Sequence, residues 1–316
     1  TKYHNSHQIY TTKGIPQVAR TIMLIPIGTG VGVTSVSLGM VRAFAREGVK
    51  VSYFKPIAQP KPSYNGPEVS TAVIKTGCGL DLPEPIEASR MESLASTGDT
   101  SILLEEVIAN FENHAKNCSA DVIIVEGLVP IEKHPFAASL NTQIASGIDA
   151  DIIFVTQPGN ETPNAVSDRI ETAIRSVSET STKRVLGCII NKVGGRVDCK
   201  GQPTNMESGK ETVNITSEDL EGVTKLLATI PWNSSLNAAR ASDLASFLQA
   251  TIINEGEMSS RRLTDVVFCA RDVQNMLEYI KPGALLVTSG DRADIIISIA
   301  LAAMNGVKIG ALLLTG

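Results

Sequence analysis

The 316-residue chain lacks an excess of positive charge, and it also lacks any long apolar run. Its 28 lysines and arginines stand against 33 aspartates and glutamates, so the formal net charge is −5. This balance gives no electrostatic reason to expect nucleic acid or an anionic membrane surface as a partner. The longest apolar run, near residues 295–304, is interrupted by Ser298 and is far shorter than the about 20 residues of a membrane helix. We expect a soluble protein with neither kind of partner.

Cysteine is scarce, and its spacing excludes the common zinc motifs. No two cysteines have Cys-x-x-Cys spacing, and no histidine lies close enough to suggest a metal site. The odd number and wide scatter are typical of free thiols in a reducing compartment. One of them, Cys188, lies in an apolar run, and we expect it in the core. The five cysteines are Cys78, Cys118, Cys188, Cys199 and Cys269.

What the sequence does contain is a regular alternation of strand-like and helix-like segments. The first strand is apolar throughout, which is typical of a sheet covered on both faces. The alternation predicts a doubly wound, mostly parallel α/β sheet, and such sheets bind ligands at the carboxyl ends of their strands. We predict strands at 21–25, 50–55, 121–125, 151–155, 185–190 and 228–230, and helices at 34–47, 68–76, 101–116, 136–146, 163–177 and 217–227.

The pattern restarts near residue 238, which predicts a second, smaller α/β domain. We place the domain boundary near residue 240, with a first domain at 21–240 and a second at 241–316. The chain stops just after a core strand, so we expect the second domain to be truncated and the chain to be the front part of a longer protein. The predicted elements are strands at 251–253, 265–269, 284–288 and 308–314, and helices at 238–248, 271–280 and 292–304.

Two polar segments flank or interrupt the first domain. Residues 1–20 contain three basic residues and no acid, which is typical either of a disordered leader or of the tail of an organellar transit peptide. Residues 194–216 contain four glycines, and we expect them to form a long surface excursion.

A glycine-rich loop follows the first predicted strand and leads into the first predicted helix. The run is IPIGTGVGVTS at 25–35. Glycines at such a turn let backbone N–H groups converge on an anion, and the helix start adds the positive end of its dipole. Working nucleotide-hydrolysing loops carry a lysine before the Thr/Ser pair, and here that residue is Val33. The candidate ligand-binding residues are Gly28, Thr29, Gly30, Gly32, Thr34 and Ser35.

The missing lysine leaves three interpretations open. The loop is a working ATP- or GTP-hydrolysing site, a degenerate site that still binds a nucleotide or other anionic metabolite, or a structural turn. The lysine stabilises charge during phosphoryl transfer, so its loss harms catalysis more than binding. We therefore favour the second and third interpretations over the first.

Four further residues stand at the ends of predicted strands, on the edge that the loop occupies. Glu126 could hold a metal as a Walker-B acid does, or be a solvated carboxylate. Lys55 could meet a ligand carboxylate or phosphate. Asn191 and Lys192 occupy the place where nucleotide bases often rest in such sheets. His114 and His134 are expected at the surface.

Several stretches together resemble the long form of bacterial phosphate acetyltransferase. They are ARTIMLIPIGTGVGVTSVSLG at 19–39, FKPIAQP at 54–60, VEGLVP at 125–130, ATIINEGE at 250–257, LLVTSGDRADIII at 285–297 and AAMNGVKIGALLLTG at 302–316. The resemblance implies a first domain similar to dethiobiotin synthetase and a second called DRTGG. The letters of that name match Asp291, Arg292, Thr315 and Gly316 here.

In that family the acetyl-transfer site lies in a third domain, and nothing in this chain corresponds to it. The resemblance therefore implies a regulatory and oligomerisation portion without catalytic residues, cofactor or metal. The parent enzyme interconverts acetyl-CoA plus phosphate and acetyl phosphate plus CoA. We expect nucleotide or carboxylate effectors, a homo-oligomer, and a cytoplasmic location or, from the acid-free leader, an organelle. The alternatives are an ATP-dependent ligase like dethiobiotin synthetase and a stand-alone metabolite-binding module.

Overall fold

The computed structural model describes residues 19–59, 67–131, 136–180, 184–195, 215–233 and 238–316. These residues form two compact units that divide between Trp232 and Asn233. Most of the leader at 1–20, most of the excursion at 194–216, His134 and Cys199 lie outside the described residues. The predicted boundary near residue 240 stays a prediction.

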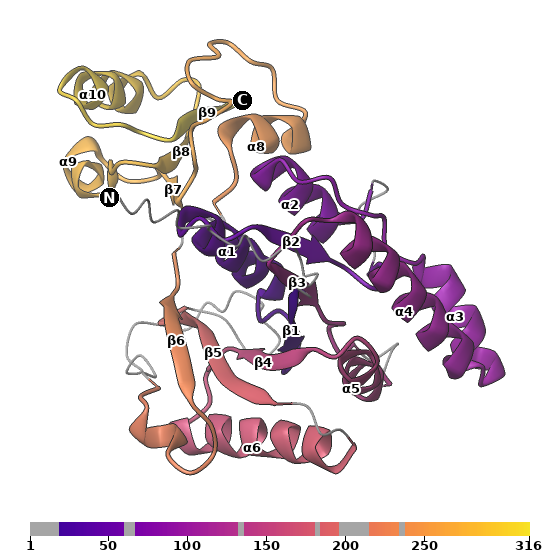
Figure 1. Cartoon of the computed structure of the whole chain (residues 1–316). Helices are drawn as coiled ribbons and strands as arrows, with labels where there is room; N and C mark the ends of the chain where they lie inside the picture. Colours follow the sequence, from indigo (N-terminus) through magenta and orange to yellow (C-terminus); the bar gives the residue numbers. More distant parts are fainter. Residues whose placement is uncertain (1–18, 60–66, 132–135, 181–183, 196–214, 234–237) are drawn as a thin grey trace, which may run out of the picture. The chain divides into compact units, whose positions relative to one another are not determined.

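The first unit is built on a six-stranded parallel sheet, as the sequence predicted. β1 lies inside the sheet between β3 and β4 (Figure 1). The chain places β2 and β3 on one side of β1 and the remaining strands on the other, so the strand order reverses at β1, and sheets of this kind bind ligands at the carboxyl end of such a strand. The order is β2-β3-β1-β4-β5-β6, with β1 at Arg20–Pro26, β2 at Val51–Phe54, β3 at Val122–Glu126, β4 at Asp151–Thr156, β5 at Val185–Val193 and β6 at Leu226–Pro231.

Helices cover both faces of this sheet, and the alternation of side chains along β1 feeds two apolar cores. Met23 and Ile25 belong to a core shared with α3 to α6, and Leu24 belongs to a core shared with α1 and α2. Burial on both faces explains the unbroken apolar run of β1. The helices are α1 (Val33–Arg46), α2 (Val69–Cys78), α3 (Ala88–Thr97), α4 (Thr100–Asn117), α5 (Ala137–Gly147) and α6 (Pro163–Thr180).

The structure confirms that Cys188 lies in the core, as predicted. It lies on β5, is fully excluded from solvent, and burial raises the pKa of its thiol to about 11. His114, by contrast, was wrongly predicted at the surface. It is buried on α4, where its Nε2 lies 2.9 Å from the hydroxyl of Ser52 and its ring stacks on Phe54. The amphipathic period of α4 turns every third or fourth residue inward, and His114 continues the buried row through Val107 and Phe111.

Two further predictions for the first unit need correction. Helix α3 was not predicted, because its sequence is polar apart from the buried Met91 and Leu94. The helix predicted at 217–227 is instead a single turn, η1 (Glu218–Leu220), and β6 already begins at Leu226. Gly222, with a φ of +77°, follows that turn in a left-handed conformation that ends any helix.

The second unit is a smaller α/β domain with a three-stranded parallel sheet. One face of the sheet packs on α9 and α10 around Leu286 and Ile299. The strand predicted at 251–253 does not form, and Ile252 and Ile253 are exposed there. The elements are α8 (Ala241–Leu248), β7 (Asp265–Phe268), α9 (Val273–Met276), η2 (Leu277–Tyr279), β8 (Ala284–Ser289), α10 (Ala293–Met304) and β9 (Ala311–Thr315), in the order β7-β8-β9.

The helices of both units are too short or too polar for a bilayer. Among the described residues, none combines the length and apolar content that spanning a membrane requires.

Candidate functional site

The loop between β1 and α1 is shaped by glycines in left-handed conformations. Gly30 has a φ of +64° and Gly32 a φ of +78°, values that residues with a Cβ rarely adopt. Gly32 is also the N-cap of α1. A Cβ added to it would come within 2.6 Å of Asn191 Nδ2, so this position needs glycine for space as well as for conformation.

The backbone N–H groups of this loop are free. The first hydrogen bond of α1 runs from Val36 N to Gly32 O, at 3.1 Å. Within the described part of the chain, the N–H groups of residues 28–35 donate to no acceptor. Eight consecutive free donors at the positive end of a 14-residue helix make a cradle for an anion.

Val33 does not contribute a polar group to this cradle. Its side chain is only 3% exposed and belongs to the apolar core under α1 and α2. The position where working loops carry a lysine therefore adds packing here rather than charge.

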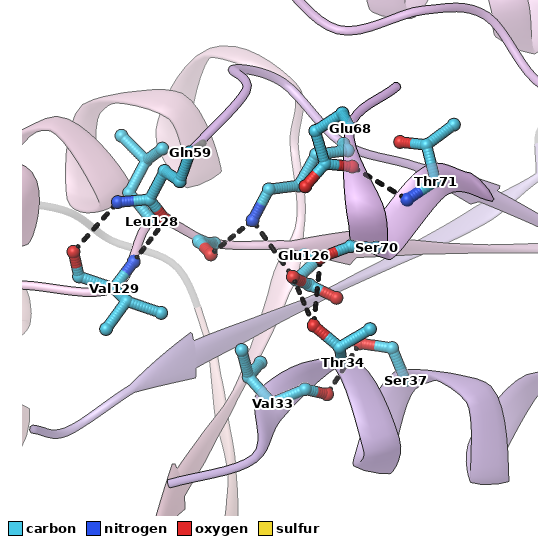
Figure 2. Close-up of polar contacts among 12 residues, drawn as sticks. Val33, Thr34, Ser37, Gln59, Glu68, Ser70, Thr71, Glu126, Leu128 and Val129 are labelled. Atoms are coloured by element: carbon cyan, nitrogen blue, oxygen red, sulfur yellow. Dashed lines mark hydrogen bonds and ion pairs between the residues drawn. The ribbon is translucent and has the colours of Figure 1, made fainter. Parts of the chain in front are cut away.

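Glu126 lies at the centre of a buried polar network beside the cradle. Its Oε1 accepts a hydrogen bond from Thr34 Oγ1 at 3.0 Å, and its Oε2 accepts one from Tyr53 OH at 3.0 Å. The Thr34 hydroxyl also lies 2.9 Å from Ser70 Oγ. Figure 2 shows Thr34, Ser70 and Glu126 pointing toward one another from α1, α2 and β3. Residues far apart in sequence are thus joined at one carboxylate.

Lys55 completes this network. Its ammonium lies 2.9 Å from Glu126 Oε1 and 3.3 Å from Gly127 O. Both side chains of the ion pair are about as buried as any in the protein, at 2% and 1% exposure. Burial, and then the charge of Glu126, raise the pKa of Tyr53 well above its usual range. The tyrosine therefore stays a neutral donor.

This arrangement does not fit a metal ion. Both oxygens of Glu126 already accept hydrogen bonds, and the Lys55 ammonium neutralises its charge. A divalent cation at Glu126 would have to displace or repel that ammonium. Among the described residues, no group of three or more His, Cys, Asp and Glu side chains could hold a metal. We therefore assign Glu126 to a structural ion pair.

Asn191 and Lys192 reach the loop from the carboxyl end of β5. Asn191 Nδ2 donates to Val31 O at 2.8 Å, and Lys192 Nζ donates to Gly30 O at 2.5 Å. Lys192 Nζ also lies 5.5 Å from the centre of the Trp232 ring. Partial burial lowers the pKa of Lys192. The two side chains thus bind two carbonyl groups of the loop.

Arg169 on α6 is a site residue that sequence reasoning missed. Its guanidinium donates to Ile27 O at 3.1 Å, Thr156 Oγ1 at 2.6 Å and Gln157 O at 3.0 Å, and it pairs with Glu161 at 2.6 Å. It therefore ties the carboxyl end of β4 to the start of the loop. No motif marks this arginine in the sequence.

Tyr53 and Ser70 were also missed. Tyr53 stands two residues before Lys55, so the alternation of side chains along β2 could have placed both on one face. Ser70 is the second residue of α2, whose place beside α1 depends on tertiary packing. The structure therefore gathers the candidate residues of the first unit at one sheet edge, with the loop cradle on one side of Thr34 and the buried ion pair on the other.

The predicted DRTGG residues lie at the carboxyl ends of β8 and β9 in the second unit. Gly290, next to Asp291, donates its N–H to Thr315 O at 2.8 Å. Arg292 makes two hydrogen bonds of 2.9 Å to the Asp294 carboxylate, and this contact lowers the pKa of Asp294 to about 2. The two halves of the motif, including Gly316 at the chain end, thus meet at one edge of the sheet.

Comparison with known proteins finds a matching family for each of the two units. A family described as an AAA domain matches residues 20–240, and one described as a DRTGG domain matches residues 243–316. The chain belongs to the AAA domain family. The DRTGG match covers Asp291, Arg292 and the chain end, as the resemblance implied.

Curated relatives that align with nearly the whole chain share one name. Phosphate acetyltransferase of Salmonella typhimurium is 46% identical over 308 residues, which cover 95% of this chain and 43% of that protein. Phosphate acetyltransferase of Escherichia coli is 45% identical over 309 residues, with the same shares. The chain thus resembles the N-terminal portion of long-form phosphate acetyltransferase, as predicted, and spans less than half the length of these relatives.

Solved structures with a similar arrangement include the signal recognition particle 54 kDa protein of Aeropyrum pernix in complex with GDP. It is 14% identical, with a TM-score of 0.40, over 59% of this chain and 38% of that one.

Proposed function

We propose that this chain is the regulatory and oligomerisation portion of a phosphate acetyltransferase, and that alone it does not interconvert acetyl-CoA plus phosphate and acetyl phosphate plus CoA. One observation carries the proposal: the loop keeps eight N–H donors that bond to no acceptor among the described residues, but it has Val33 in place of a catalytic cation. A site of this kind can bind an anion without performing chemistry on it.

The energetics favour binding over turnover. Losing one preorganised charge-stabilising donor typically costs about 3 kcal/mol of transition-state stabilisation. The Walker-B-like Glu126 is held by Lys55 and Thr34, so it does not supply a metal ligand either. Anion binding by the backbone N–H groups and the α1 dipole needs neither of these parts.

The effectors we propose are anionic metabolites, either nucleotides or small carboxylates, and the assembled enzyme is a cytoplasmic homo-oligomer. The net charge of −5 supports small anions held at a local cradle rather than nucleic acid bound over a broad surface. No cofactor is assigned to this chain.

Two measurements on the purified chain test the proposal. The first is acetyl phosphate formation from acetyl-CoA and phosphate, which we expect to be absent; turnover by this chain alone would contradict the proposal. The second is the melting temperature with a panel of nucleotides and small carboxylates, which should rise with at least one of them by mass action.

A matched pair of variants locates that binding. Gly30→Val places a β-branched residue at a φ of +64° and should abolish the shift. Gly39→Val makes the same change in α1, where an added Cβ meets nothing within 4 Å, and should keep it. ATP hydrolysis that is lost in Thr34→Ala would instead support the ligase-like alternative.

A further inference from the structure

Two lysines lie beside the loop that lacks its own, and they differ in what they contact. Lys55 contacts a carboxylate, at 2.9 Å from Glu126 Oε1. Lys192 contacts the neutral carbonyl of Gly30, at 2.5 Å, and in the described part of the chain no carboxylate pairs with its ammonium. The two cations are therefore not equally available to an incoming anion.

Lys55 is the less available cation. Moving it away from Glu126 would leave a carboxylate of 1% exposure without its charge partner, and an unpaired buried charge is strongly destabilising. Lys192 gives up a hydrogen bond to a carbonyl and a cation–π contact with Trp232, but no charge partner. A charged acceptor binds an ammonium roughly twice as strongly as a neutral one does, so an anion in the loop outcompetes Gly30 O.

The position of Lys192 is fixed by its surroundings. Its backbone has a φ of +58°, which is uncommon for a residue with a side chain. Its own N–H donates to Asn191 Oδ1 at 2.9 Å, while Asn191 Nδ2 holds Val31 O. Strained residues of this kind persist where the surrounding contacts hold them, and they cluster at ligand sites.

We propose that Lys192 is the cation that binds a phosphorylated ligand in the loop, replacing the lysine missing at position 33, and that its movement is passed to Trp232. This inference rests on the proposed function, because it needs an anion in the loop. A phosphoryl group suits the site better than a carboxylate does. It has more oxygens to accept from both the N–H groups and the Lys192 ammonium.

Trp232 gives the binding a consequence beyond the loop. The centre of its ring lies 5.5 Å from the Lys192 ammonium, and its backbone N–H donates to Val193 O at 2.8 Å. It is the last residue of the first unit. When Lys192 turns to a phosphate it leaves the indole face, and the cation–π contact is lost. A ligand in the loop thereby changes the residue from which the chain leaves this unit.

The experiment is a fluorescence titration of the full chain with inorganic pyrophosphate in EDTA, since Trp232 is the single tryptophan of the sequence. We expect saturable binding with a change in tryptophan emission, and weaker binding of succinate. Lys192→Met should weaken pyrophosphate binding about tenfold, in line with the loss of one charged hydrogen bond. Lys192→Arg should retain most of the affinity. Lys50→Met, an exposed lysine elsewhere in the unit, should behave as wild type.

The outcomes separate this inference from the proposed function. No pyrophosphate binding by the wild type, or binding that survives Gly30→Val, overturns both this inference and the loop as the anion site of the proposed function. Binding that requires Gly30 but is equally tight in Lys192→Met, or leaves Trp232 emission unchanged, overturns only the role of Lys192. Equal melting temperatures of the unliganded variants show that a loss of affinity does not come from unfolding.

Discussion

Lys55 places its ammonium 2.9 Å from Glu126 Oε1 in a part of the protein that water barely reaches, since the two side chains are 2% and 1% exposed. A pair at this depth gives little net stability compared with apolar residues, but breaking it is costly because the remaining charge has no partner. The pair therefore holds the edge of β2 to that of β3 and keeps Glu126 away from other ligands.

Lys55→Met should accordingly destabilise the first unit by about 3–5 kcal/mol. Urea denaturation followed by circular dichroism measures the loss, and Lys50→Met is the exposed control. The double variant Lys55→Met/Glu126→Leu removes both charges and should recover part of the stability. If the single and double variants were equally unstable, lost packing rather than the unpaired carboxylate would be the cause.

Gly32→Ala should disturb the loop in two ways. The new Cβ would lie 2.6 Å from Asn191 Nδ2, and alanine would have to adopt a φ of +78°. We expect a loss of about 1–3 kcal/mol together with the loss of any anion-induced rise in melting temperature. In contrast, Gly39→Ala in α1 meets no atom within 4 Å and should stabilise by up to about 1 kcal/mol through helix propensity. An unchanged anion response in Gly32→Ala would contradict our account of the loop.

Arg169→Lys should loosen the same loop from the other side. Lysine keeps the charge and its pair with Glu161, but it cannot reproduce the bonds to Ile27 O, Thr156 Oγ1 and Gln157 O together. We expect a stability loss of about 1–3 kcal/mol and faster hydrogen exchange at the carboxyl ends of β1 and β4. Arg175→Lys, on the exposed side of α6, should change neither measurement.

His114 should make the first unit sensitive to mild acid. Burial lowers its pKa from 6.5, against a smaller opposing effect of Asp81. As the pH falls, the unfolded chain therefore takes up a proton at a higher pH than the folded chain does. The contribution of His114 to the free energy of unfolding is fully present above pH 6.5 and declines as the pH falls below it. The slope for one proton is at most about 1.4 kcal/mol per pH unit.

Urea midpoints between pH 8 and pH 5 measure this dependence. His114→Gln removes the titrating ring, so its stability should fall less than that of the wild type over the same range. Identical pH profiles would show that His114 is protonated equally in both states.

The sequence was sufficient to predict the parallel sheet, because burial on both faces requires unbroken apolar strands, as in β1 and β3. It was also sufficient for the loop, where glycines are needed for local backbone reasons. It failed where local preference conflicts with packing. Thr224 and Lys225 were assigned to a helix, but Lys225 O lies against the glycine at 187 on β5, and the segment becomes the approach to β6.

The candidate site, too, could be predicted only in part from the sequence. Lys55, Glu126, Asn191 and Lys192 could be named because strand ends of a parallel sheet share one edge. Which of them pair with one another could not be named, since the Lys55–Glu126 contact spans 71 positions. Ser70 and Arg169 enter the site from helices, whose rotation and position are decided by tertiary packing.

The buried thiol of Cys188 offers a way to measure the lifetime of the folded first unit. The thiol lies on β5, between β4 and β6, with a pKa near 11, and a thiol reacts with labelling reagents only as an exposed thiolate. Because β5 is paired on both sides within a covered sheet, this sulfur meets reagent only after a large part of the first unit opens. The rate of its modification under native conditions would therefore report how long the folded state lasts.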